Sequence, residues 1–91
     1  MKSITVNGRR ISKVVIDEHV GKHRDITDSL ILKVVSKLDG ERFVPEDLKG
    51  PFEYFATLIE LSAKQYRLVW LLEENEIYLG VITIYRDDRS K

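Results

Sequence analysis

The chain contains no cysteine, which excludes disulfide bonds and thiolate metal sites and leaves its stability to packing alone. It also lacks any apolar run long enough to span a membrane. The first residues mix polar with apolar side chains, so the hydrophobic core of a signal peptide is missing as well. These absences predict a cytoplasmic protein without a membrane partner.

Net charge is absent too, because 15 basic residues balance 15 acidic ones. The charges are nevertheless unevenly spread: residues 1–24 hold six Lys and Arg against two acids, and residues 25–63 hold four against eight. The basic N-terminal part could face an anionic ligand such as RNA, which the acidic middle would repel. The alternative is an ordinary mixed surface of solvated charges.

What is present indicates one globular domain covering residues 1–91. The sequence is 43% hydrophobic and 33% charged, which fits neither a disordered nor a membrane-embedded chain. A chain of 91 residues can bury about 60–65% of its unfolded surface, enough for a single modest core.

The chain is predicted to open with a β-hairpin. Residues 4–6 and 10–16 are rich in β-branched side chains and flank Asn7-Gly8. Asn-Gly favours a type I′ turn because both of its central residues need positive φ. A polar stretch with one glycine, residues 17–25, follows as a loop.

One amphipathic helix is predicted from a cap at Thr27, or Asp25, through Leu38. Gly40 is expected to end it in the left-handed conformation. Apolar residues recur at spacings of one, three and four and form one stripe: Leu30, Ile31, Val34, Val35 and Leu38. That stripe needs a sheet to cover.

The C-terminal half predicts an antiparallel meander with strands at residues 54–61, 66–72 and 77–86. The expected fold is therefore α+β with the element order ββαβββ. Both faces of the last two strands are largely apolar, so the helix would cover one face. The hairpin, a partner subunit or a ligand would cover the other.

Both histidines of the protein stand in one short stretch, residues 19–24, together with two cations. Histidine titrates near neutrality, so His19 and His23 could exchange protons while Lys22 and Arg24 hold an anion such as a phosphodiester. The alternative is a pair of exposed loop residues.

A zinc site is a further alternative, since His19 and His23 would share a face if their segment were helical. Neighbouring acids could complete the ligand set: Asp17, Glu18 or Asp25. Gly21 and the later helix cap argue against that helix, so we expect no metal and no cofactor.

Read in order, the His-x-x-x-His segment, the single helix and the closing strand GVITIYR resemble the superfamily of barnase, EndoU, colicin ribonucleases and RelE-type toxins. The similarity covers roughly residues 19 to 86 and is nearest to phage-borne and toxin-system members. It departs from them in the N-terminal hairpin and in the zero net charge.

The resemblance implies metal-independent cleavage of RNA by attack of the 2′-hydroxyl. It implies catalytic residues at the front and the back of the domain: His19, Lys22 and His23, then Thr83, Tyr85 and Arg86. The histidines would act as base and acid, and Lys22 or Arg86 would stabilise the phosphorane.

Other interpretations remain open for the last strand and for the aromatic residues. Thr83 and Tyr85 could be ordinary β-formers, with Arg86 closing the sheet end. Tyr66 and Trp70 could stack on bases, although a central strand favours a place in the core. The competing function is a binding module without catalysis, whose apolar sheet holds an antitoxin-like protein or a second copy of the chain.

Overall fold

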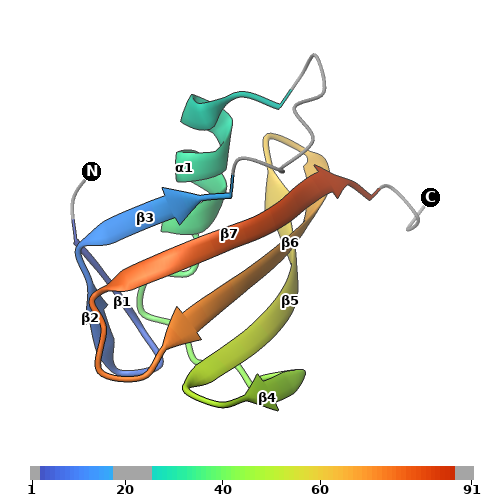
Figure 1. Ribbon diagram of the computed structural model, residues 1–91. Coiled ribbons are helices and arrows are strands. Elements are labelled where there is room, and N and C mark those ends of the chain that lie inside the picture. The colour runs from blue at the N-terminus through green and yellow to red at the C-terminus, as the bar shows by residue number, and fades with distance from the viewer. Residues whose placement is uncertain (1–2, 18–25, 88–91) are drawn as a thin grey trace.

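A computed structural model describes residues 3–17 and 26–87 and shows an α+β fold with one helix. A two-stranded sheet and a mixed five-stranded sheet accompany that helix (Figure 1). The elements in chain order are β1 (Ile4–Val6), β2 (Arg9–Ile11), β3 (Lys13–Ile16), α1 (Asp28–Ser36), β4 (Asp47–Lys49), β5 (Phe52–Leu61), β6 (Lys64–Glu73) and β7 (Tyr78–Arg86). None of the described residues forms a helix that is long and apolar enough to cross a membrane.

The N-terminal hairpin is confirmed, and its turn has the predicted geometry. Asn7 and Gly8 have φ values of 54° and 73°, the two positive angles of a type I′ turn. The Asn7 side chain also bridges to Phe43, donating to its carbonyl and accepting from its N–H. The turn is thereby fixed to the segment that follows the helix.

The single second strand expected over residues 10–16 is wrong. Ser12 donates its N–H to the Ile77 carbonyl at 2.9 Å, so the chain leaves β2 there and moves to the edge of the large sheet. Residues beyond Ser12 form β3, which pairs parallel with β7, Lys13 lying opposite Tyr78 and Ile16 opposite Val81. A short hairpin strand thus gives way to a parallel edge strand.

The five-stranded sheet has the order β3-β7-β6-β5-β4. Its centre is the predicted meander, since β5, β6 and β7 pair antiparallel in sequence order. The expected ββαβββ order is not matched, because β3 makes the sheet mixed and the short β4 adds an edge before β5. Both additions are edge strands of three or four residues, too short for a period of two to reveal them.

The helix begins where predicted. Thr27 is the N-cap, and its hydroxyl accepts from the Leu30 N–H at 3.1 Å. The helix proper ends at Ser36, two residues earlier than expected, and a turn carries the buried Leu38 to Gly40. Gly40 has the expected positive φ of 80°, and its N–H donates to the Thr5 carbonyl, which ties the end of this turn to β1.

The core lies between α1 and one face of the large sheet. Its largest side chain is Trp70, which stacks on Phe55 at 4.1 Å between ring centroids and donates from Nε1 to the Thr57 hydroxyl. Trp70 and Tyr66 are both buried, so their expected place in the core is confirmed and they offer no surface for bases.

The hairpin packs on the helix side of the sheet. Its apolar residues Ile4, Val6 and Ile11 belong to the same buried cluster as Val34 and the inward residues of β6 and β7. The expectation that the hairpin could cover the other face is therefore wrong, because the short strands bury their apolar positions beside the helix. Within the described part of the chain, the opposite face of the sheet carries no second layer (Figure 1).

A β-bulge interrupts β7. Thr83 lies opposite Val69, but Val81 lies opposite Trp70, so Ile82 is an extra residue on β7. Leu79, Val81 and Ile84 are buried on the helix side, whereas a regular alternation would have turned Ile84 outward. The bulge therefore sets which face the end of β7 presents.

Candidate functional site

The uncovered face of the sheet is the candidate functional surface, and we call it the open face. It carries the alternate residues of β3, β5, β6 and β7 that do not point toward α1. Three of its apolar or aromatic side chains are well exposed, Leu58 at 46%, Val15 at 42% and Tyr85 at 42%. The remaining central positions of this face are partly exposed, among them Tyr54, Val69, Leu71 and Ile82.

Two of the predicted site residues lie together on the open face. Thr83 is opposite Val69 and Tyr85 is opposite Arg67, and both β6 residues belong to the face that turns away from the helix. The bulge at Ile82 is the cause, because without it Thr83 and Tyr85 would continue the inward series of Leu79 and Val81. The structure therefore presents two hydroxyl groups side by side on one strand.

Arg86 does not join them. It is opposite Tyr66, whose side chain is buried on the helix side, so the register assigns Arg86 to the other face at the exposed end of β7. The sequence pattern already separates Arg86 from Tyr85, since adjacent strand residues point in opposite directions.

His19, Lys22 and His23 lie outside the described residues. The segment that contains them follows Asp17, whose N–H donates to the Val81 carbonyl at 3.0 Å. Asp17 thus adjoins β7 two residues before Thr83. The last described residue before the segment is therefore fixed beside Val81 of β7.

Arg67 is a candidate residue that sequence reasoning missed. Its guanidinium donates from Nε and Nη2 to Oδ2 of Asp87, at 3.4 and 3.3 Å. Asp87 is buried just beyond β7, and its own N–H donates to the Gln65 carbonyl. Arg67 is thereby held on the open face, opposite Tyr85. Arg67 and Asp87 are 20 residues apart in the sequence, so no local sequence pattern indicates their pairing.

A groove lies on the same face, between β3, β6 and β7. It has a volume of about 210 Å³, and its lining includes Val15, Asp17, Leu71, Tyr78, Gly80 and Ile82. The Tyr78 hydroxyl donates to Glu73 Oε1 at 2.6 Å. That hydrogen bond, followed by burial and the negative charge of Glu73, raises the pKa of Tyr78 to about 12.

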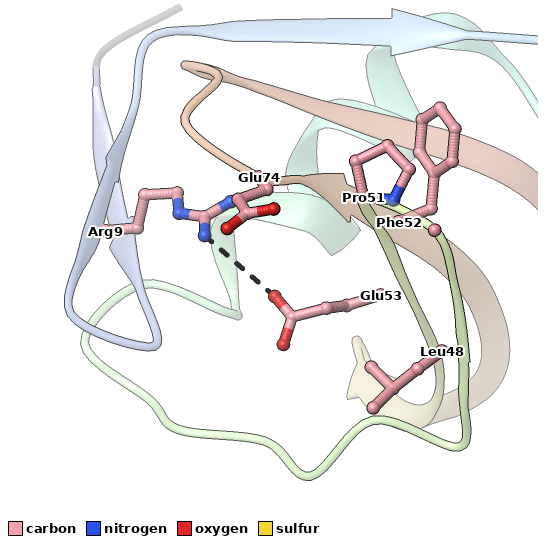
Figure 2. Close-up of a pocket in the computed structure, with 7 residues that line it drawn as sticks. Arg9, Leu48, Pro51, Phe52, Glu53 and Glu74 are labelled. Atoms are coloured by element: carbon pink, nitrogen blue, oxygen red, sulfur yellow. Dashed lines mark ion pairs between the residues drawn. The ribbon is translucent and has the colours of Figure 1, made fainter.

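A second hollow, of about 280 Å³, lies at the end of the sheet where the hairpin approaches the β4–β5 turn and the β6–β7 turn (Figure 2). Arg9 reaches across it, donating from Nη1 to the Glu73 carbonyl at 2.7 Å and pairing with Glu53 Oε1 at 4.0 Å. Glu74 and the apolar Leu48, Pro51 and Phe52 complete the wall. Arg9 therefore links the hairpin to the sheet through the Glu73 carbonyl and the Glu53 carboxylate.

The described residues contain no group of three His, Cys, Asp or Glu side chains placed to hold a metal ion. No family model, curated protein or solved structure matches the chain. The functional argument therefore rests on the open face and on the residues that the sequence singles out.

Proposed function

We propose that this protein is a small metal-independent ribonuclease that cleaves RNA on the open face of its sheet. The observation that carries the proposal is the hydroxyl pair of Thr83 and Tyr85, turned outward by the β7 bulge, with Arg67 opposite Tyr85 on the neighbouring strand. Hydroxyls donate to phosphate oxygens, and an arginine offsets the negative charge of a phosphorane. Bulges are common beside active sites, where they re-aim side chains.

The chemistry is attack of the 2′-oxygen on phosphorus with departure of the 5′-oxygen. One of His19 and His23 takes the proton of the 2′-hydroxyl, and the other returns a proton to the leaving oxygen. Thr83 and Tyr85 bind the non-bridging oxygens, and Arg67, which the Asp87 carboxylate orients, neutralises the charge that develops on them. The products are a 2′,3′-cyclic phosphate and a free 5′-hydroxyl.

The test is cleavage of single-stranded RNA by the purified protein in EDTA, with the product ends identified. His19→Ala, His23→Ala and the conservative Thr83→Val and Tyr85→Phe are compared with Tyr66→Phe, which alters a buried tyrosine on the helix side. Each histidine variant should lose roughly 10²- to 10⁴-fold in rate, while Tyr66→Phe keeps the rate. Cleavage that survives both histidine substitutions, or no cleavage at all, contradicts the proposal.

The second candidate function is a binding module that uses the open face to hold a protein, either an antitoxin-like partner or another copy. The exposed Leu58 and Val15 favour it, since exposed apolar surface on a small protein marks interaction sites. Sedimentation analysis decides whether the chain self-associates. A dimer that Leu58→Glu dissociates, together with inert behaviour toward RNA, would establish the module instead.

A further inference from the structure

Asn7 joins the N-terminal hairpin to the segment that follows the helix. Its side-chain amide makes two hydrogen bonds with the backbone of Phe43: Nδ2 donates to the carbonyl oxygen at 3.1 Å, and Oδ1 accepts from the N–H at 2.5 Å. Its own N–H donates to the Glu41 carbonyl at 3.0 Å. One residue therefore supplies three hydrogen bonds between the two segments.

Phe43 connects this contact to the core. Its ring packs edge-on against Trp70, with 5.5 Å between the ring centroids and an angle of 87° between the ring planes. An aromatic pair of this geometry stabilises a core beyond the area that it buries. The Phe43 segment is thus held by the Asn7 amide on one side and by the buried Trp70 on the other. A change at Asn7 should therefore be detectable at Trp70.

The glycine that follows Asn7 allows a spontaneous reaction of the side-chain amide. The backbone nitrogen of Gly8 can attack Cγ of Asn7, because a residue without Cβ permits this close approach. A bond forms between that nitrogen and Cγ, the Cγ–Nδ2 bond breaks, and Nδ2 leaves as ammonia with the proton that the Gly8 nitrogen loses. Water then opens the five-membered succinimide and gives aspartate or isoaspartate.

The folded turn prevents this ring closure. Asn7 and Gly8 have the positive φ values of a type I′ turn, in which the first central residue has a ψ of about +30°. That ψ places the following nitrogen opposite to Cβ about the Cα–C bond, whereas a five-membered ring requires the two atoms to be nearly eclipsed. The two bonds to Phe43 also restrict rotation of the amide. Asn7 can therefore react only while the turn is locally open.

Neither product can restore the contact with Phe43. Aspartate has an oxygen in place of Nδ2, so a negatively charged group would face the Phe43 carbonyl where a hydrogen bond of 3.1 Å now lies. Isoaspartate adds one atom to the backbone, which the two-residue turn between Val6 and Arg9 does not accommodate. Either product therefore makes a transient opening of the hairpin permanent.

We infer that Asn7 is a deamidation site that the fold protects, and that its conversion detaches the Phe43 segment from the hairpin. Water is the only co-reactant, and ammonia is released. The inference is independent of the proposed ribonuclease, since no residue of the open face takes part in the reaction.

The first test compares the deamidation rate of the wild-type protein at pH 8 in buffer and in urea. Ion exchange separates the product, which carries one additional negative charge, and peptide mapping distinguishes Asn7 from Asn75, the only other asparagine. We expect Asn7 to react at least about 30-fold more slowly in the folded protein, a factor that two ordinary hydrogen bonds supply. Equal rates in buffer and in urea would overturn the inference.

Phe43→Ala tests whether the contact with Trp70 controls the reaction. The variant keeps Asn7 and Gly8 but removes the ring that fixes the Phe43 segment. We expect deamidation of the folded protein to become about 3- to 10-fold faster, while the rate in urea stays that of wild type. Val44→Ala is the matched control, because Val44 is 87% exposed and should change neither rate. A folded Phe43→Ala protein that reacts at the wild-type rate contradicts the inference.

Asn7→Asp reproduces one product, and Asn75→Asp is its matched control. Asn75 also has a positive φ, of 63°, but it is exposed in the turn between β6 and β7. We expect Asn7→Asp to lower the equilibrium constant for folding about tenfold or more, because the Phe43 carbonyl loses its donor. The fluorescence of Trp70 should move to longer wavelength, since water reaches the ring edge that Phe43 now covers.

The control variant Asn75→Asp should change stability and fluorescence little. Equal stabilities and equal spectra of the two aspartate variants would overturn the inference. If Asn7→Asp does not fold, the comparison of wild-type rates in buffer and in urea still decides the case, because it needs no substitution.

Discussion

Tyr85 lies directly opposite Arg67 across β7 and β6, and the arginine is held by Asp87, two residues beyond that tyrosine. One strand thus supplies both a hydroxyl for the open face and, just past its end, the carboxylate that orients the facing cation. The arrangement joins the candidate site to the stability of the C-terminal end of the sheet.

The first prediction concerns the Arg67–Asp87 pair. Asp87 is almost fully buried and Arg67 is about one quarter exposed. The pair should therefore contribute more than an exposed ion pair and less than a fully buried one. We expect Asp87→Asn to lower the free energy of unfolding by about 1–2 kcal/mol. Urea denaturation of both single variants and of the double variant with Arg67→Gln measures the coupling. A coupling of zero would show that the pair stabilises nothing.

The second prediction tests the bulge with two neighbouring truncations. Ile84 is 1% exposed and Tyr85 is 42% exposed because Ile82 shifts the alternation of β7. Ile84→Ala should cost about 2–5 kcal/mol of stability, whereas Tyr85→Ala should cost less than about 1 kcal/mol. Chemical denaturation gives both values. The reverse order would mean that β7 alternates regularly and that Tyr85 faces the core.

The third prediction concerns the first turn. Gly8 has a φ of 73°, which a β-branched residue resists, and an added Cβ would lie 3.2 Å from Nη2 of Arg42. Gly8→Val should therefore cost about 1–3 kcal/mol. Arg10→Val places the same side chain at an exposed strand position of the same hairpin and should cost little. Thermal melts compare them, and equal losses would contradict a type I′ turn.

Local signals predicted the parts of the fold that depend on neighbouring residues. Asn7-Gly8 and the Thr27 cap act over two to four residues, and both appear where expected. The turn between β5 and β6 also needs two positive φ values, yet Ser62 and Ala63 adopt them without the usual glycine or asparagine. Tertiary pairing over the ten-residue strands overrides the local preference there.

Long-range pairing explains what the sequence could not reveal. The parallel contact of β3 with β7 joins residues that are more than 60 positions apart, and no local pattern encodes it. The bulge at Ile82 has no special residue to mark it, because isoleucine fits a regular strand equally well. The hydroxyl pair was predictable as two residues on one face, but which face they share depends on that bulge.

The last prediction concerns the pH dependence of Tyr78. Its folded pKa of about 12 exceeds the ordinary value of 10.0, because the phenol donates to Glu73 and a phenolate beside that carboxylate would be repelled. A pKa raised in the folded state means that the folded protein holds its proton longer. The hydrogen bond should therefore stabilise the protein fully below pH 10 and lose that effect as the pH rises toward 12.

Tyr78→Phe should lower the free energy of unfolding by about 1 kcal/mol at pH 8. The difference in the free energy of unfolding between wild type and Tyr78→Phe should shrink between pH 10 and 12. Lysines and the remaining tyrosines titrate equally in both proteins, so their contribution cancels in this difference. Absorbance at the tyrosinate band provides the direct check. In the folded wild type, one of the four tyrosines should ionise about two pH units above the ordinary value, and this step should be missing from the variant. A difference that stays constant up to pH 12 would show that Tyr78 and Glu73 are not bonded in solution.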